Sequence, residues 1–517
     1  MRIAIAAALL LAVSATSVVG EVKTPFELTT DAADQKVMAE VAAAVSNQDS
    51  NIKARLDAAL AKLPRPTPLR GMVQMLRATV LMNDKEMGPA VAAIEEALRL
   101  LPDNPDPKFI ATAVFTFSGS PQRAADIWLQ ASEESPERAR TMDSYLLSTL
   151  MGRLTDIGDR ARADRIGARL AAIGYSAGLA SDRSNAAVAQ TREEIRGGNT
   201  AAALADVASI ANPFDLLTLY VDRRYDVLWP RIAEWAGADL SGQSRRYLEE
   251  LRGDWTAADD FDTATTYARG LGRFGATEAI VALLGPMLDR PVAAGIEYLA
   301  PVVASALETL GRDKEALALL KKVADKSPPD EFGRGLNIDA AYVTLATMRT
   351  DWPQVLATAD AFLARARGFG EGINRSALVS VTAWRGCALW QLGRREEAER
   401  PMAEVLILAA LSPAAAMNVH LCRGDTAAAR ALLIARLADP ESRTWALLFV
   451  QPERVQMRTP LSRMMAPLEQ SVRTAPDVLA AAQRVGRILP QPIGASLPGG
   501  FDPYRAPSPK PRVPGAI

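Results

Sequence analysis

Apolar residues recur along this chain at intervals of three and four, in segments that end at proline or glycine. In the segment 90–105, AVAAIEEALRLLPDNP, Ala90, Ile94 and Ala97 stand at i, i+4 and i+7. This spacing predicts an amphipathic helix, because one helical turn takes 3.6 residues. Proline has no amide hydrogen to continue a helix, so we expect the helix to end before Pro102.

The same pattern returns at a fixed interval. The segment AADIWLQASEESPER repeats the first helix 34 residues further along the chain. A period of about 34 residues is typical of a helix-turn-helix repeat. The matched positions are Ala90 with Ala124, Ile94 with Trp128, Ala97 with Ala131, and Pro102 with Pro136.

Three later segments keep the turn glycine and the small residue, two of them also have the stopping proline, and the middle one has a further glycine, Gly386, in its first helix. Glycine stands where one helix ends, since it takes the left-handed conformation without steric cost. A small residue stands where two helices cross, since it lets them approach closely. These positions are Gly311, Ala316 and Pro328, then Gly386, Gly393 and Ala398, then Gly424, Ala429 and Pro440.

On these residues the sequence resembles the tetratricopeptide-repeat (TPR) family, whose pattern has small residues at helix crossings, a turn, and a proline after the second helix. The resemblance implies an all-α fold, an α-solenoid of stacked helix-turn-helix repeats that forms a right-handed superhelix. It also implies a concave face, built from the first helix of each repeat, that holds a peptide or a partner domain. The positions that the register places in this groove are Met75, Thr79, Met82, Phe109, Ala113 and Thr116.

Two interpretations of those groove positions stay open. The Lys and Asn with which family members clamp a terminal carboxylate are absent from them, so we do not expect such a clamp. Methionine is flexible and polarisable, and an adaptable apolar groove is one interpretation. The other is that the methionines belong to the core.

The spacing of the repeats also divides the chain into parts. The spacing drifts between about 140 and 280, and the period breaks at 221–262. Residues 31–62 predict two helices that cap the stack, because a terminal repeat must cover its neighbour. The stretch after 487 is rich in Pro and Gly and cannot form a packed core. We expect a signal peptide (1–20), an N-terminal helical cap (21–68), TPR-like repeats (69–220), an irregular helical junction (221–262), further TPR-like repeats (263–440), C-terminal capping helices (441–487) and a disordered tail (488–517).

The N-terminus has the three parts of a secretory signal peptide. A basic Arg2 precedes an apolar run, and the small residues Val18 and Gly20 stand just before Glu21. This predicts cleavage before Glu21 and export to the periplasm, with secretion as the alternative. An uncleaved anchor is the other interpretation, since the run approaches the roughly 18 to 20 residues that span a bilayer. We expect no integral membrane segment after cleavage.

The composition favours a helical protein, and the net charge argues against a nucleic-acid partner. The chain is 49% hydrophobic, 23% charged and only 6% aromatic, which favours helices over strands. Its formal net charge is -1, with both signs interspersed, so we expect no nucleic-acid partner. Nothing in the composition fixes the oligomeric state.

The sequence offers little for catalysis. A single histidine, His420, rules out two-histidine zinc motifs, and no nucleophile motif such as G-x-S-x-G accompanies it. No phosphate-binding glycine loop is present. Asp259, Asp260 and Asp262 suit a helix start, where carboxylates accept bonds from exposed amides. We therefore expect a protein that is not an enzyme and has no catalytic residues, cofactor or metal.

The two cysteines, Cys387 and Cys422, fall in first helices of consecutive repeats. A disulfide needs Cα atoms within about 7 Å, whereas neighbouring helices pack roughly 8 to 10 Å apart. The register also places Cys422 one turn deeper than Cys387, which disfavours pairing. Both alternatives stay open: a disulfide, which export would permit, or two buried free thiols.

Together these features predict a periplasmic, non-enzymatic scaffold that binds a protein or peptide of the cell envelope in a helical groove. The alternative is a component that binds polysaccharide or assembles envelope or exopolysaccharide, since the eight tryptophans could stack on sugars.

Overall fold

The computed structural model of this chain describes residues 31–47, 50–175, 180–291, 293–326, 335–453, 458–494 and 496–505. Regular structure in these ranges is helical, and the sole β-type pairing among them is an isolated bridge between Asp222 and Gly486. The predicted signal peptide lies outside the described residues. None of the described helices has the length and apolarity needed to cross a bilayer.

The chain forms two compact units, which are described separately. Unit 1 comprises residues 1–155 and 161–177, and unit 2 comprises 156–160 and 178–517. The division therefore falls near 156–178, whereas the broken period had pointed to a junction at 221–262. The helices of unit 1 are α2 (Ala32–Ser46), α3 (Ile52–Lys62), α4 (Pro68–Asn83), α5 (Met87–Leu100), α6 (Asp106–Phe117), α7 (Pro121–Glu134), α8 (Pro136–Arg140), α9 (Ser144–Asp156) and α10 (Arg160–Ala172).

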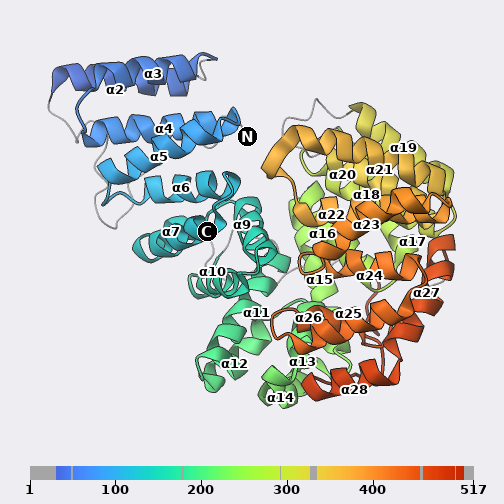
Figure 1. The fold of residues 1–517 in the computed structure, drawn as a ribbon. Helices are drawn as coiled ribbons and strands as arrows, with labels where there is room; N and C mark the ends of the chain where they lie inside the picture. Colours follow the sequence, from blue (N-terminus) through green and yellow to red (C-terminus); the bar gives the residue numbers. More distant parts are fainter. Residues whose placement is uncertain are drawn as a thin grey trace. The chain divides into compact units, whose positions relative to one another are not determined.

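Unit 2 holds the longer run of helices (Figure 1). Four of them are short 3₁₀ segments, labelled η. In chain order they are α11 (Ala180–Arg196), α12 (Thr200–Asp206), η1 (Val207–Ser209), α13 (Pro213–Tyr220), η2 (Arg223–Leu228), α14 (Trp229–Ala236), α15 (Ser241–Ala258), α16 (Phe261–Arg273), α17 (Thr277–Leu284), η3 (Gly285–Asp289), α18 (Ile296–Thr309), α19 (Asp313–Lys326), α20 (Leu336–Met348), α21 (Trp352–Ala366), η4 (Arg367–Gly372), α22 (Arg375–Gln391), α23 (Arg395–Ile407), α24 (Pro413–Cys422), α25 (Thr426–Ala438), α26 (Arg443–Phe449), α27 (Pro460–Arg473) and α28 (Pro476–Val485).

The chain is an all-α solenoid of TPR-like helical hairpins, as the repeat predicts. Consecutive helices such as α4 and α5, α6 and α7, and α22 and α23 pack against each other. The alanines of the repeat are fully buried at these contacts, where a longer side chain would keep the helices apart. They are Ala90, Ala97, Ala124, Ala131, Ala316, Ala398 and Ala429.

The turn glycines close the first helix of a hairpin. Gly311, Gly393 and Gly424 have φ of 74°, 77° and 71°, a left-handed conformation that suits glycine. In each turn, the residue after the glycine donates its amide to the carbonyl five residues back, over 2.9 Å. This bond uses a carbonyl that the end of the helix leaves without a partner.

The prolines of the repeat differ in their roles. Helix α5 ends at Leu100, before Pro102, as expected. Pro136 is the first residue of the short helix α8, a position that needs no amide hydrogen. Pro328 lies outside the described residues.

Unit 2 closes on itself. Buried residues of α12–α14 and of α24–α28 form one hydrophobic cluster, although more than 170 residues separate the two groups in sequence. The predicted irregular junction belongs to this core, since Leu228, Ile232 and Leu240 are fully buried in it. The first and last helices of unit 2 thus support each other.

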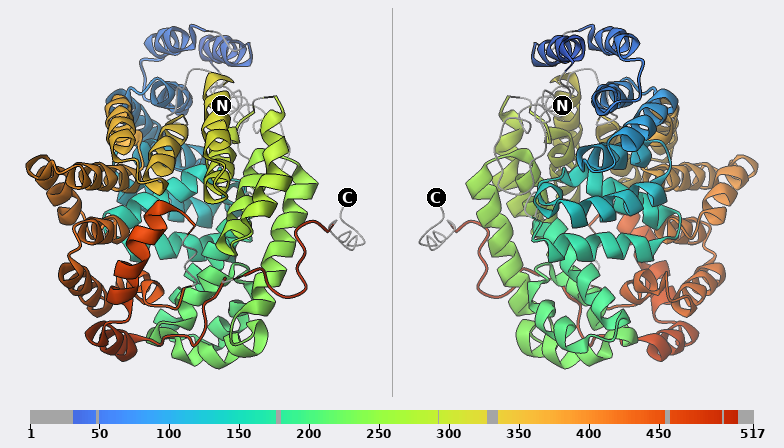
Figure 2. Two further views of the ribbon diagram at one scale, coloured as in Figure 1. Left: turned by 90° about the vertical axis from the view of Figure 1, so that its right-hand side faces the viewer. Right: turned by 90° about the vertical axis from the view of Figure 1, so that its left-hand side faces the viewer.

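The segment after α28 is packed, which corrects the prediction of a disordered tail for its first part. Leu489 and Phe501 are buried, and Arg252 donates to the carbonyls of Asp502 and Arg505 over 2.7 and 2.9 Å. In Figure 2 this segment, drawn dark red, crosses the green helices of unit 2. Residues 506–517 lie outside the described part of the chain.

Candidate functional site

The residues predicted to line a groove in unit 1 are mostly interior. Met75, Thr79, Phe109 and Thr116 are buried, with at most 5% of each exposed. The hydroxyls of Thr79 and Thr116 donate to carbonyls of their own helices, over 3.2 and 2.7 Å. These four positions therefore offer no free surface, and the groove prediction is wrong for them. Met82 and Ala113 are half-buried.

A cavity of about 870 Å³ lies within unit 2. It is bounded by α13, α16, α22, α24, α26 and α27, by the ends of α17 and α18, and by the segment that follows α28. This size suits a small ligand or a few residues of a peptide. The closure of unit 2 on itself produces the cavity, since its walls come from both ends of the unit.

The apolar part of the cavity wall is made by large side chains from several helices. These side chains are Phe214 of α13, Trp384 of α22, Leu448 of α26, Met465 of α27 and Ile493 of the C-terminal segment. Trp384 is half-buried, and its ring also packs against neighbouring hydrophobic clusters.

Several polar groups of the wall have no partner within the described ranges, and three of them lie on α22, α24 and α27. Glu469 of α27 accepts no hydrogen bond and forms no ion pair there. The carboxamide of Asn418 on α24 and the indole N–H of Trp384 are also unbonded among those residues. Polar groups that are partly withdrawn from water and unpaired cost free energy until a ligand or water satisfies them.

Glu469 lies beside a second carboxylate. Glu453 pairs with Arg473 over 2.8 Å, and the Arg473 guanidinium also stands 5.3 Å from the centre of the Phe449 ring. Burial raises the pKa of Glu469, and the charge of Glu453 raises that pKa further, while Arg473 lowers it. Arg473 forms its ion pair with Glu453, and Glu469 forms no ion pair within the described residues.

A second charged group occupies the wall formed by α13 and α16. The Arg273 guanidinium lies 5.1 Å from the centre of the Phe214 ring. Burial raises the pKa of Asp215 to about 6, and the side chains of Ser184 and Asn212 and the charge of Arg273 offset this only in part. Oδ2 of Asp215 has no hydrogen-bond partner in the described structure.

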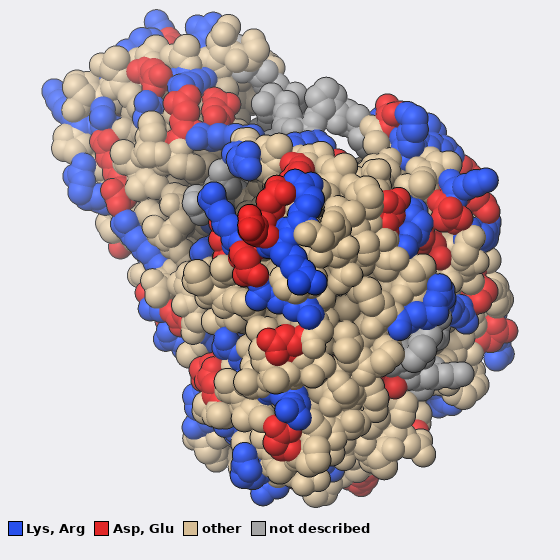
Figure 3. Space-filling model, turned by 45° about the vertical axis from the view of Figure 1, so that its right-hand side comes forward, with Lys and Arg blue, Asp and Glu red and all other residues tan. Residues whose placement is uncertain are grey.

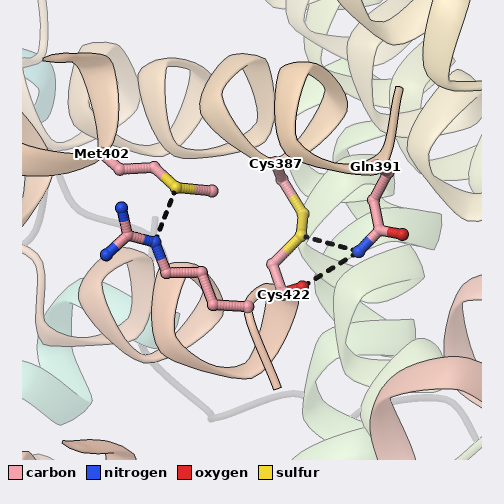
Figure 4. The surroundings of a disulfide bond; sticks show 5 residues. Cys387, Gln391, Met402 and Cys422 are labelled. Atoms are coloured by element: carbon pink, nitrogen blue, oxygen red, sulfur yellow. Dashed lines mark hydrogen bonds between the residues drawn. A yellow bond between two sulfur atoms is a disulfide. The ribbon is translucent and has the colours of Figure 1, made fainter. Parts of the chain in front are cut away.

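Cys387 and Cys422 form a disulfide with Cα atoms 5.8 Å apart, between α22 and α24 (Figure 4). The Gln391 amide donates to the carbonyl of Cys422 over 2.9 Å and approaches its Sγ at 3.7 Å. The difference in depth inferred from the repeat register does not keep the two helices from approaching at this point. The bridge ties together the helices that carry Trp384 and Asn418, each about one turn away from a cysteine.

The aspartates and the histidine that the sequence analysis considered for catalysis lie in environments typical of structural residues. Asp260 caps α16 by accepting from the amide of Thr263 over 2.8 Å, and Asp259 pairs with Arg290 over 2.9 Å. His420 is half-buried, and burial lowers its pKa. Within the described part of the chain, no three His, Cys, Asp or Glu side chains are grouped to hold a metal ion.

Charges on the surface are mixed. On the face drawn in Figure 3, Lys and Arg alternate with Asp and Glu, beside broad uncharged areas. Many of them form ion pairs between neighbouring helices, such as Arg123 with Glu95 and Arg385 with Asp360. The face shows no extended field of one sign.

Sequence reasoning did not find the cavity. Trp384, Asn418 and Glu469 occupy no shared position of the repeat, and they come together through the packing of α22, α24 and α27, while the opposite wall from α13 and α16 is added by the closure of unit 2. The sole related signal was the cysteine pair, which marks two helices of the cavity wall.

No protein-family model matches the chain, and no curated protein matches it. Among solved structures, one similar chain is the apo form of the quorum sensor NprR from B. thuringiensis, with 13% identity and a TM-score of 0.31 over 72% of this chain and 97% of that one. Another is the structure of Naa15/Naa10 bound to HypK-THB, with 16% identity and a TM-score of 0.25 over 77% of this chain and 68% of that one. Similarity at this level carries no argument about function.

Proposed function

We propose that this protein is a non-enzymatic scaffold of the cell envelope that binds a peptide or protein segment in the cavity of unit 2. The observation that carries the proposal is the cavity itself, where apolar side chains stand beside the unpartnered Glu469, Asn418 and Trp384 N–H. Such a wall can bury part of a peptide and bond its polar groups.

The location in the periplasm, with secretion as the alternative, is part of the same proposal. It rests on the predicted signal peptide and is supported by the disulfide, because disulfides persist in oxidising compartments. Both cysteines of the chain are used in that bridge. Fractionation of cells into periplasm, cytoplasm and medium tests the location directly.

Crosslinking from inside the cavity tests the binding role. A photo-reactive residue is placed at Gln491, which is exposed and lines the cavity, and a control is placed at Ile407, which is 82% exposed on α23 outside it. Mass spectrometry then identifies the material attached after irradiation of living cells.

We expect a defined protein partner attached at Gln491 and not at Ile407. Attachment of polysaccharide alone at Gln491 would move the assignment to the sugar-binding alternative. Identical products from both positions would contradict the cavity as the binding site.

A further inference from the structure

We infer that the cavity of unit 2 selects an extended peptide segment with a lysine or arginine side chain, which pairs with Glu469 while a neighbouring apolar side chain of the segment packs against Trp384 and Leu448. This inference rests on the proposed function and adds the chemistry of the partner.

The charges of the wall support a cationic ligand. Three carboxylates, those of Asp215, Glu453 and Glu469, face a single lining guanidinium, that of Arg273. Arg473 neutralises Glu453 through its ion pair, whereas the charge of Arg273 lowers the pKa of Asp215 without an ion pair between them in the described structure. Asp215 and Glu469 are therefore two carboxylates beside one lining guanidinium, which leaves an excess of negative charge, and Glu469 forms no ion pair among the described residues.

The surroundings of Glu469 make it costly to leave unpaired. Its side chain is half-buried on α27, and the neighbouring Glu453 repels its charge. Removing a carboxylate from water without a counter-ion is unfavourable, and a ligand cation removes that penalty. The raised pKa of Glu469 shows that its charged form is disfavoured in the absence of a ligand, and a bound cation would favour that form again.

The remaining unpartnered groups suit a peptide backbone. The carboxamide of Asn418 has both donor and acceptor capacity, so it can bond the N–H and C=O of one peptide unit. The indole N–H of Trp384 supplies a second donor. Asn418 and Trp384 lie on helices joined by the disulfide, which keeps these groups at a fixed spacing.

A neutral sugar fits these observations less well. Stacking on a sugar needs an open aromatic face, whereas the Trp384 ring packs against side-chain clusters of unit 2. A neutral sugar also brings no cation to Glu469. The apolar surface of Leu448 instead suits an aliphatic side chain.

The test uses the full chain and a random ten-residue peptide library displayed on phage. Selection is run in parallel on the wild type, on Glu469→Gln and on Glu396→Gln. Glu396 is exposed on α23 and does not line the cavity, so its variant carries the same chemical change at a neutral position.

We expect peptides selected on the wild type and on Glu396→Gln to be enriched in Lys and Arg, and this enrichment to disappear on Glu469→Gln. A selected peptide, measured by fluorescence anisotropy, should bind Glu469→Gln at least about tenfold more weakly, since bonds to charged groups contribute about 1.5 to 3 kcal/mol. Replacing its basic residue with norleucine should weaken binding to the wild type by a similar factor and leave binding to Glu469→Gln unchanged.

The results distinguish a failure of the inference about the basic side chain from a failure of the proposed scaffold function. Selected peptides without basic residues, or equal binding by the wild type and Glu469→Gln, overturn the inference and leave the scaffold proposal standing. Failure to select any peptide on the wild type overturns both. If Glu469→Gln has an altered circular dichroism spectrum, Glu469→Asp replaces it, and a loss of affinity limited to peptides with a basic residue is the supporting outcome.

Discussion

At the scale of single residues, burial decides what a side chain contributes. Alanines of the repeat are buried because two helices meet over them, and a sequence pattern is enough to locate them. Asp215 is different, because Ser184 and Arg273, which act on its carboxyl group, belong to helices 31 and 58 residues away. Its raised pKa could not be read from neighbouring residues.

Asp215 should make the stability of unit 2 depend on pH. Burial raises its pKa from 3.8 to about 6 in the folded protein, so the folded state holds the proton over a range in which the unfolded chain has lost it. The contribution of Asp215 to the free energy of unfolding therefore falls as pH rises from about 4 to 6, by at most about 3 kcal/mol.

The variant Asp215→Asn removes this ionisation. We expect it to be more stable than the wild type at pH 7 and equally stable below pH 4, as measured by urea titration with tryptophan fluorescence. Seven of the eight tryptophans lie in unit 2, so this signal reports mainly on that unit. The control Asp226→Asn changes an exposed aspartate of η2 and should show no such difference. A stability gap that is constant with pH would contradict the assignment.

Gly386 should tolerate no side chain, because α22 and α23 cross at this point. A Cβ atom there would lie 2.8 Å from Cγ of Met402. We expect Gly386→Ala to lower the free energy of unfolding by about 1 to 2 kcal/mol, since overpacking outweighs the better helix propensity of alanine.

Gly152, in the middle of α9, provides the matched comparison. No atom lies within 4 Å of a Cβ placed there, so Gly152→Ala should raise stability by about 0.5 to 1 kcal/mol. Both variants are measured by thermal denaturation followed by circular dichroism. Effects of the same sign would show that the close crossing does not determine the glycine at 386.

At the scale of elements, residues close in sequence determine each helical hairpin, but they do not determine which distant elements pack against it. The turn glycines, the helix ends and the buried alanine stripe follow from residues within one 34-residue period. Contacts between distant elements do not, as the packing of the C-terminal segment after α28 shows. Proline and glycine prevent a helix there, and they did not prevent Leu489 and Phe501 from being buried.

The disulfide should stabilise the pair of helices α22 and α24. It joins residues 35 apart, and closing a loop of this length in the unfolded chain corresponds to a stabilisation on the order of 4 kcal/mol. We expect the double variant Cys387→Ala, Cys422→Ala to lose about 2 to 4 kcal/mol in urea titration.

Reductant provides the control for this effect. It should destabilise the wild type toward the value of the double variant and leave the double variant unchanged. If the disulfide also holds Trp384 and Asn418 at their spacing, the double variant should bind a selected peptide more weakly. Equal stability of the oxidised and reduced wild type would refute a stabilising role for the bridge.

At the scale of the whole molecule, the C-terminal segment joins the two ends of unit 2. The Arg487 guanidinium lies 3.5 Å from the centre of the Tyr220 ring and 4.2 Å from that of Trp229, and it donates to the Tyr220 carbonyl over 2.7 Å. Gln451, which follows α26, bonds the same segment by accepting from the amide of Leu489 and donating to the carbonyl of Arg487. These contacts close one wall of the cavity.

Removing the Arg487 side chain should loosen the attachment of the segment after α28 to Tyr220 and Trp229. We expect Arg487→Ala to lose about 1 to 3 kcal/mol of stability and to increase hydrogen exchange in residues 486–494. Arg484→Ala, at an exposed position of α28, is the control. Unchanged exchange in that segment would show that other contacts hold it.

The sequence alone determined the class of this fold, because a helix, its turn and its buried stripe are encoded within one repeat. It also supplied the cysteine pair, without deciding whether the thiols are joined. Tertiary structure decided that Cys387 and Cys422 are bridged, that the predicted groove residues of unit 1 are mostly buried, and that unit 2 contains a partly open cavity. The physical reason is distance along the chain: the cavity wall combines side chains from α13 to the segment after α28, and no local pattern records which of them meet.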